Sequence, residues 1–336
     1  MKKKFKIKII AEAGVNHNGS IKLAKKLIDV AKKANCDYVK FQAFKAEELA
    51  TLKAKKTNYQ KINQKDTELQ FKMLKKLEFT KDDFIELKKY CKKKKIKFLC
   101  TAFDPDFLSF IIKLKIDVIK IPSGEINNIF LLKKAAQFKK PILLSTGAST
   151  IKDIKFALKI LKKTKNKVYL MQCSSAYPTP IEHANINTIK EFSKIADGTG
   201  FSDHTLNHEP AIAAIALGAE YIEKHFTLNR KMKGPDHRAS LDPKQLELFV
   251  KSLRNAELSL GKKVKMINRL ERKNLKFIRR IVVAKENIKI NEKFKIQNLT
   301  IKRSFLTNKN YEPKEILNLI NKKSNKNYKI NEEIQK

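Results

Sequence analysis

The sequence predicts an α/β fold: a TIM (β/α)8 barrel followed by a small β-rich domain. Short β-rich segments alternate with amphipathic helical segments eight times between residues 7 and 260, and this number of repeats is typical of a TIM barrel. The strand segments are almost continuously apolar, as expected for parallel strands buried on both faces. A doubly wound open sheet is the alternative, but no Gly-x-Gly-x-x-Gly motif follows the first strand.

The elements of the barrel follow from these patterns in order. The predicted strands are residues 7–11, 38–43, 98–101, 118–122, 142–146, 168–173, 199–203 and 221–225. The predicted helices are residues 21–34, 81–94, 105–114, 129–138, 151–162 and 210–217. A last helix, residues 243–260, begins after Asp242, which is a suitable N-cap, and has Pro243 in its first turn.

Three segments lie outside the regular repeat. Residues 45–76 form a polar stretch longer than an ordinary βα loop, which we interpret as an insertion over the barrel mouth. With the barrel assigned to residues 1–262, the basic residues 263–280 are predicted to be a linker. Residues 281–336 then form a small domain with short strands at 281–283, 288–290 and 299–301, and its core is marginal alone, so we expect it to dock on something.

Composition excludes several functional classes. The formal net charge is +40, but lysines occur in every segment and no nucleic-acid-binding motif is present, so we expect no nucleic-acid partner. No stretch approaches the roughly 20 consecutive apolar residues of a membrane-spanning helix, and Lys8 and Glu12 interrupt the apolar N-terminal run, so neither a membrane partner nor a signal peptide is expected. The four cysteines form no Cys-x-x-Cys pair, which fits free thiols in the cytoplasm.

Lysines and serines gather at the carboxyl ends of the predicted strands. Lys40 and Gln42 alternate on the second strand, so both side chains point to one face. A lysine such as Lys40 or Lys120 inside an apolar strand is costly without a partner, and an ion pair with a glutamate is the plain structural explanation. Since TIM-barrel enzymes place their chemistry at this face, the lysines together with serines predict a site for a small anion.

Two histidines end consecutive strands. His204 and His225 are separated by one helix, and neighbouring parallel strands lie about 5 Å apart, so both imidazoles are expected in one place. With Asp203 and Asp236 nearby, they suggest a divalent metal or an acid/base cluster. His183, His208 and His237 lie in polar stretches and are expected to be exposed, whereas His17 could orient Glu12 or cap the following helix.

Eight segments, taken together, resemble the sialic acid synthase (N-acetylneuraminate synthase) family. They are AEAGVNHNG (11–19), VKFQ (39–42), KIPSGE (120–125), LSTG (144–147), YPTP (177–180), FSDH (201–204), EKHFT (223–227) and GPDHRAS (234–240). The resemblance extends over nearly the whole chain, and residues 281–334 look like the C-terminal antifreeze-like (SAF) domain of that family.

This resemblance implies an enzyme that condenses phosphoenolpyruvate with the open-chain aldehyde of N-acetylmannosamine and water, giving N-acetylneuraminate and phosphate by C–O cleavage. A synthase of legionaminic or pseudaminic acid, acting on a diacetamido-trideoxy hexose, is the alternative. The resemblance also implies a cytoplasmic, domain-swapped homodimer and a divalent metal, Mn²⁺ or Mg²⁺.

The resemblance assigns roles to individual residues. The metal ligands would be His204 and His225. The residues that hold phosphoenolpyruvate would be Lys40, Lys120, Ser123, Ser145, Ser175 and Ser202. The sugar would contact Gln42, Tyr177 and Arg303, and the residues at the reacting groups would be Glu12, Glu125 and Asp236, with Glu12 and Glu125 as the acid/base candidates.

Overall fold

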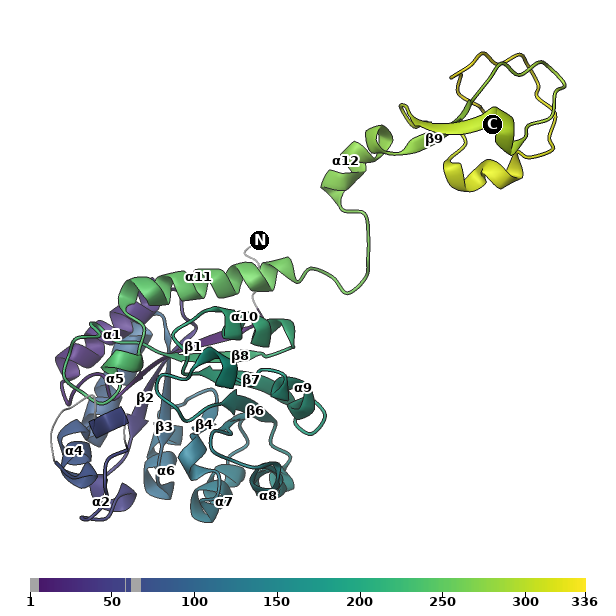
Figure 1. The fold of residues 1–336 in the computed structure, drawn as a ribbon. Coiled ribbons are helices and arrows are strands. Elements are labelled where there is room, and N and C mark those ends of the chain that lie inside the picture. Colours follow the sequence, from purple (N-terminus) through teal and green to yellow (C-terminus); the bar gives the residue numbers. More distant parts are fainter. Residues whose placement is uncertain (1–5, 58, 62–67) are drawn as a thin grey trace. The chain divides into compact units, whose positions relative to one another are not determined.

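The computed structural model describes residues 6–57, 59–61 and 68–336, and these form two compact units that divide after Gly261. The first unit is a closed barrel of eight strands in sequential order, and β1 pairs in parallel with β8 to close it (Figure 1). The strands are β1 (Lys8–Gly14), β2 (Tyr38–Ala43), β3 (Lys97–Ala102), β4 (Ile119–Ile121), β5 (Ile142–Ser145), β6 (Val168–Cys173), β7 (Gly198–Asp203) and β8 (Tyr221–His225). The predicted TIM barrel is confirmed.

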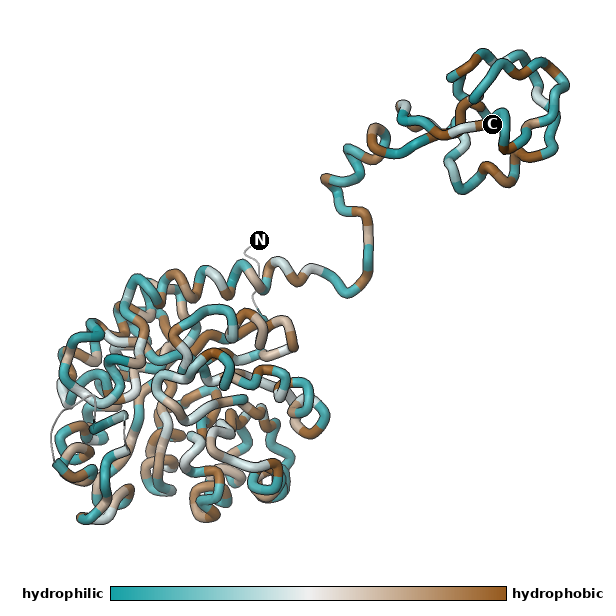
Figure 2. Tube along the Cα trace, viewed as in Figure 1, coloured by the Kyte–Doolittle hydropathy of each residue, from teal (hydrophilic) through white to brown (hydrophobic). Residues whose placement is uncertain are grey.

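Helices cover the outside of this barrel. They are α1 (Ile21–Lys33), α5 (Lys81–Lys94), α6 (Pro105–Lys113), α7 (Ile129–Gln137), α8 (Ile151–Leu161), α9 (Thr188–Phe192), α10 (Glu209–Ala216) and α11 (Pro243–Ser259). The carboxylate of Asp242 accepts a hydrogen bond from the Gln245 N–H at 2.9 Å, so the predicted N-cap is confirmed. Hydrophilic and hydrophobic residues alternate along α11, as an amphipathic helix requires (Figure 2).

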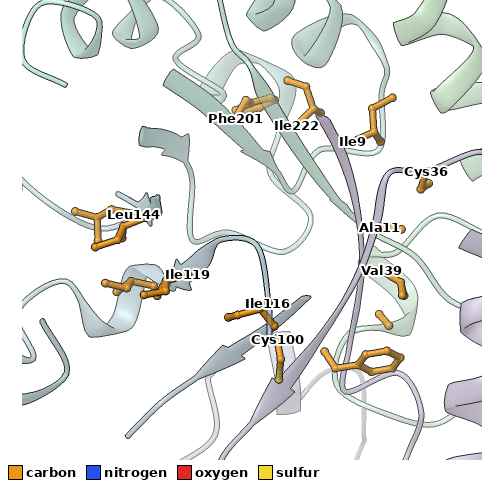
Figure 3. Packing of buried hydrophobic residues seen from close by; sticks show 14 of the residues in the cluster. Ile9, Ala11, Cys36, Val39, Cys100, Ile116, Ile119, Leu144, Phe201 and Ile222 are labelled. Carbon is orange, nitrogen blue, oxygen red and sulfur yellow. The ribbon is translucent and has the colours of Figure 1, made fainter. Parts of the chain in front are cut away.

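The strand periodicity divides the core into two layers. One set of alternate side chains packs outward against the helices, and it includes Ile9, Val39, Ile119 and Ile222 (Figure 3). The other set fills the barrel interior, where a small apolar cluster contains Ile10, Tyr38, Leu99, Val118, Leu143 and Met171. On the strands that contribute to this cluster, the polar residues two positions further on, such as Glu12 and Lys40, share its inward face.

The described part of the insertion at residues 45–76 includes α2 (Ala46–Leu49) and most of α4 (Gln70–Leu77). Met73, Leu74 and Leu77 of α4 pack on Val15 and Phe44, which follow β1 and β2 at their carboxyl ends. The described part of the insertion therefore lies at the barrel mouth, as predicted. Residues 58 and 62–67 of the predicted insertion lie outside the described residues.

The second unit has a small core of its own around an antiparallel pair, β9 (Arg280–Ala284) and β10 (Leu299–Arg303). The strand predicted at residues 288–290 is wrong: Ile288 makes an isolated bridge to Tyr328, and the chain turns at Asn291, whose φ is 66°. The stretch expected to be a linker also differs, because it contains α12 (Arg269–Ile278). Asn268 and Glu271 form a capping box at the start of this helix, in which each side chain accepts a hydrogen bond from the backbone N–H of the other residue. No residue of the helix is buried, so the helix was not visible as a buried apolar face.

No helix among the described residues is long and apolar enough to cross a membrane. This finding agrees with the absence of a long apolar stretch in the sequence.

Because each unit has a separate core, the barrel is expected to fold without the second unit. A chain ending at Gly261 should unfold in one cooperative thermal transition, with a midpoint within about 5 °C of the barrel transition in the full chain. Circular dichroism measures the transition. A truncated chain that melts without cooperativity would show that the barrel core depends on residues 262–336.

Candidate active site

A cavity of about 310 Å³ opens at the carboxyl ends of the barrel strands. It is lined by most of the residues that the sequence singled out: Glu12, Lys40, Gln42, Lys120, Ser123, Ser145, Ser175, Tyr177, Ser202, His204, His225 and Asp236. These side chains come from strands and loops spread over the whole chain, and closure of the barrel brings them together.

The floor of the cavity is a buried cluster of lysines and glutamates. The Lys40 Nζ lies 3.1 Å from Glu12 Oε1 and 3.4 Å from Glu223 Oε1, and the Lys120 Nζ lies 3.5 Å from Glu223 Oε1. Each of the four residues is at most 3% exposed. The predicted ion pair between each buried lysine and a glutamate is therefore confirmed. The lysines nevertheless face the cavity and remain available to an anion.

Glu223 is the residue of this cluster to which sequence reasoning gave no role. It lies two positions before His225 on β8, so both side chains share the inward face, and that spacing was the available signal. Burial raises the pKa of Glu223, but the charges of Lys120 and Lys40 outweigh burial and hold the pKa at about 2. Glu223 is therefore the anion that allows two ammonium groups to be buried side by side.

The two lysines differ in how fully they are compensated. Burial lowers the pKa of Lys40, yet Glu12 and Glu223 together leave it raised. For Lys120 the net direction is downward, because burial outweighs the attraction of Glu223. Each ammonium group also donates to a hydroxyl, Lys40 to Thr101 at 3.0 Å and Lys120 to Ser145 at 2.8 Å. Lys120 would therefore gain most from a bound anion.

A hydroxyl-lined cradle lies beside Lys120. The Gly147 N–H donates to Ser123 Oγ at 2.9 Å, and a Cβ at Gly147 would lie 2.4 Å from Ser175 Oγ and 2.9 Å from Ser123 Oγ. A methyl group at this position would therefore have to displace one or both serine hydroxyls. Ser202 is used differently, because its hydroxyl donates to Glu223 Oε1 at 3.1 Å and so supports the charge cluster.

The two predicted metal ligands do lie together. The imidazole centroids of His204 and His225 are 5.3 Å apart. The Nδ1 of His204 lies 2.6 Å from the Ser174 carbonyl, which leaves its Nε2 for another partner, and the buried His225 Nδ1 has no hydrogen-bond partner. Within the described ranges, no group of three or more His, Cys, Asp or Glu side chains is placed to hold a metal ion. The protein therefore offers two imidazoles rather than a closed ligand set.

The prediction that Asp203 lies beside these histidines is wrong. Its carboxylate accepts from the Lys224 Nζ at 2.7 Å, and Lys224 packs over the ring of Phe249 on α11, outside the barrel. Lys224 also donates to the carbonyl oxygens of Thr205 and Asn207. Side chains alternate along a strand, so Asp203 and Lys224 both point away from the cavity. Their ion pair connects β8 with the end of β7 and the loop that carries His204.

The expectation that His237 is exposed is also wrong. Its Nδ1 lies 2.6 Å from Thr227 Oγ1 and its Nε2 lies 3.2 Å from Asn18 Oδ1, and the side chain is buried. Asn16, which lies with Asn18 in the turn after β1, donates from its side-chain amide to the Phe226 carbonyl and to Ser240 Oγ. The turn after β1 therefore anchors the loop that carries Asp236, an arrangement that local polarity does not reveal.

Neither proposed role for His17 is found. Ser20 caps α1, and His17 instead stacks on Phe79 with ring centroids 3.9 Å apart. Its Nδ1 accepts a hydrogen bond from the Gly19 N–H at 3.1 Å. His17 thus packs the turn after β1 against the chain that follows α4.

Two predicted site residues are not among those that line the cavity. Glu125 is half-buried in the short 3₁₀ turn η1 (Ser123–Glu125), where its carboxylate accepts from Asn128 Nδ2 at 2.6 Å. Burial raises its pKa. Arg303 ends β10 in the second unit, where it is exposed, and its contact with a sugar stays a prediction.

The insertion adds lining residues that sequence reasoning missed. They are Thr57, Tyr59, Gln60, Met73, Leu74 and Leu77. Met73, Leu74 and Leu77 follow a helical pattern in the sequence, but their place at the cavity depends on how the insertion packs at the barrel mouth. Met73, Leu74 and Leu77 add apolar side chains to the lining, in contrast to its charged floor.

A cavity at the carboxyl ends of the strands is where barrel enzymes carry their active sites. A family model described as the NeuB family matches residues 27–265, and the chain belongs to this family. Its homologues are sialic, legionaminic and pseudaminic acid synthases. The chain is accordingly a nonulosonic acid synthase, and an enzyme of carbohydrate biosynthesis.

Individual relatives agree over most of the chain. It is 41% identical to an N,N'-diacetyllegionaminic acid synthase of Campylobacter jejuni, with 97% of this chain and 98% of that protein covered. It is 34% identical to the human N-acetylneuraminate-9-phosphate synthase, over 94% of this chain and 88% of that protein. The crystal structure of an N-acetylneuraminic acid synthetase from Leptospira borgpetersenii, in complex with citrate, superposes with a TM-score of 0.71 at 34% identity, covering 80% of this chain and 90% of that one.

The cradle at Gly147 can be tested by adding one methyl group. Gly147→Ala is expected to weaken binding of phosphoenolpyruvate or inorganic phosphate at least about tenfold, because the methyl group displaces Ser123 or Ser175. Gly124→Ala is the comparison variant within the same cavity lining, since a Cβ there meets no protein atom within 4 Å. Calorimetric titration gives the affinities, and unchanged binding to Gly147→Ala would place the anion elsewhere.

Asp236 makes stability depend on pH. Burial, and then the charge of Glu12, raises the pKa of Asp236 to about 6 from 3.8. The folded carboxyl therefore binds its proton more tightly than the unfolded one, and stability falls as pH rises from about 4 to 6. Asp236→Asn should remove this loss and gain up to about 3 kcal/mol at pH 7, but little at pH 4. Denaturant unfolding at both values checks this, with exposed Asp106→Asn as the control. An equal gain at both pH values would contradict it.

Proposed function

We propose that this chain condenses phosphoenolpyruvate with the open-chain aldehyde of an acetamido sugar and with water, giving a nonulosonic acid and phosphate. The observation that carries the proposal is the pair of buried lysines, Lys40 and Lys120, facing one cavity together with a hydroxyl cradle. A compact dianion with a carboxylate and a phosphate matches two ammonium groups set beside several hydroxyl donors.

The described residues suggest how the substrates are held. Lys120 with Ser145 and the Ser123–Gly147–Ser175 cradle would bind one anionic group of phosphoenolpyruvate, and Lys40 would bind the other. The C3 of the enolpyruvate then forms a bond with the aldehyde carbon, water adds at C2, and the C–O bond to phosphate breaks.

The carboxylic acids around the cavity would handle the protons. The pKa of Asp236 is about 6, so a fraction of this side chain is protonated near neutral pH and could donate to the aldehyde oxygen. Burial raises the pKa of Glu12 more than Lys40 lowers it, which suits a group that accepts a proton from the attacking water. Gln42 donates to Glu12 Oε1 at 3.0 Å and fixes its orientation.

The histidine pair supports a divalent metal, Mn²⁺ or Mg²⁺, held by His204 and His225. The free side of the His204 ring and the unpartnered His225 Nδ1 fit an ion whose remaining ligands are water and substrate oxygens. When bound, such an ion supplies a Lewis acid for the aldehyde oxygen. A cytoplasmic, domain-swapped homodimer remains a further prediction.

One observation favours a particular sugar. N-acetylmannosamine and a diacetamido-trideoxy hexose are the two candidates, and Met73, Leu74 and Leu77 give the cavity an apolar flank. A deoxy carbon and a second acetyl methyl group bury well against such a flank, whereas an extra hydroxyl loses hydration there. The 41% identity to a diacetyllegionaminic acid synthase supports the same choice. A product of the legionaminic type is therefore proposed ahead of N-acetylneuraminate.

Phosphate release tests this function directly. The purified chain is incubated with phosphoenolpyruvate, Mn²⁺ and either sugar, and released phosphate is measured with and without a chelator. Turnover is expected with both sugars, with a kcat/KM at least about tenfold higher for the diacetamido-trideoxy hexose, because one buried methyl group is worth roughly 1 kcal/mol and a misplaced hydroxyl costs as much. A chelator should abolish it. The absence of sugar-dependent release would refute the proposed reaction.

A further inference from the structure

Tyr59 is a cavity residue for which the reaction above has no role. It comes from the insertion after β2, and its half-buried side chain lines the cavity together with Asp236 and Tyr177. These residues reach the cavity from different parts of the chain. Tyr59 therefore joins the insertion to the loops after β6 and β8.

A polar chain fixes the direction of the Tyr59 hydroxyl. The Thr57 N–H donates to Gln60 Oε1 at 3.1 Å, which turns the amide so that Gln60 Nε2 faces the Tyr59 oxygen at 3.4 Å. Because that oxygen accepts from Gln60, its own proton is free to point to the Asp236 carboxylate, with which Tyr59 makes a hydrogen-bonding interaction. The two groups act on each other, because burial and then the Asp236 carboxylate raise the pKa of Tyr59, while the Tyr59 hydroxyl lowers the pKa of Asp236 against the larger effect of burial.

A series of ring contacts connects the same side chain to the histidines through Tyr177. The Tyr59 ring lies 4.8 Å from that of Tyr177 with a 30° interplanar angle, and the Tyr177 ring lies 4.1 Å from that of His204. The series continues to His225, 5.3 Å from His204. Tyr177 therefore lies next to both Tyr59 and the imidazoles, and it links the insertion to the histidine side of the cavity.

We propose that Tyr59 is a specificity-determining residue of the sugar subsite, which positions Asp236 through its hydroxyl and supports Tyr177 beside the histidines through its ring. The assignment rests on the proposed function, because it presumes that a sugar aldehyde enters this cavity. The chemistry implies a ligand with a hydroxyl for Asp236 and an apolar face for the Tyr59 ring, as an acetamido sugar has.

Two variants of the full chain separate the hydroxyl from the ring. Tyr59→Phe keeps the stack and removes the hydroxyl, and it is expected to raise the KM for the sugar about tenfold while the KM for phosphoenolpyruvate stays within about twofold. Tyr59→Leu removes the stack as well and should also reduce the preference between the two sugars. Initial rates are measured with each substrate varied at a saturating level of the other.

Tyr90→Phe is the matched control. The Tyr90 hydroxyl donates to the Asp29 carboxylate at 3.0 Å on the outer helices, away from the cavity lining, so its loss should leave both KM values unchanged. Thermal melting verifies that each variant is folded. If Tyr59→Leu does not fold, the sugar KM of Tyr59→Phe alone tests the role of Tyr59.

The outcomes distinguish failure of the role assigned to Tyr59 from failure of the proposed reaction. An active wild type with an unchanged sugar KM in Tyr59→Phe would overturn the assignment alone, as would an equal rise of both KM values. A wild type that releases no phosphate with any sugar would overturn the proposed function and this assignment with it. A selective rise in the sugar KM supports both.

Discussion

The interaction between Glu223 and the ammonium groups of Lys40 and Lys120 sustains the rest of this site. Two buried cations at the end of a barrel repel each other and lose their hydration, and an isolated pair would not remain charged. Glu223 lies within 3.5 Å of both, and Glu12 adds a second carboxylate beside Lys40. The barrel can therefore keep positive charge at its mouth before any substrate arrives.

Buried polar contacts hold the loops around this charge cluster. Lys224 and Asp203 form an ion pair on the outer face of the strands and fix the chain next to His204. On the opposite side, Asn18 and His237 anchor the loop that carries Asp236. Most of these partners are far apart in sequence, so the site is rigid only after the barrel has closed.

The sequence on its own determined the barrel and much of its site. Strand and helix periods are local properties, so the eight strands appear with bounds close to those observed, and β2, β6 and β8 have the predicted bounds. The period of two along a strand also placed Lys40 and Gln42 on one face, and the spacing of consecutive strand ends paired His204 with His225. The regular geometry of a parallel barrel converts such local spacing into position.

Only the tertiary structure decided which polar residue meets which. Asp203 and His237 have the same local polarity as true site residues, yet the first faces outward to Lys224 and the second is buried against Asn18. Tyr59 has no local mark of function and Glu223 is marked only by its spacing from His225, because their roles depend on partners from other strands and loops. The physical reason is that burial and charge compensation are set by neighbours in space, and the sequence states only neighbours along the chain.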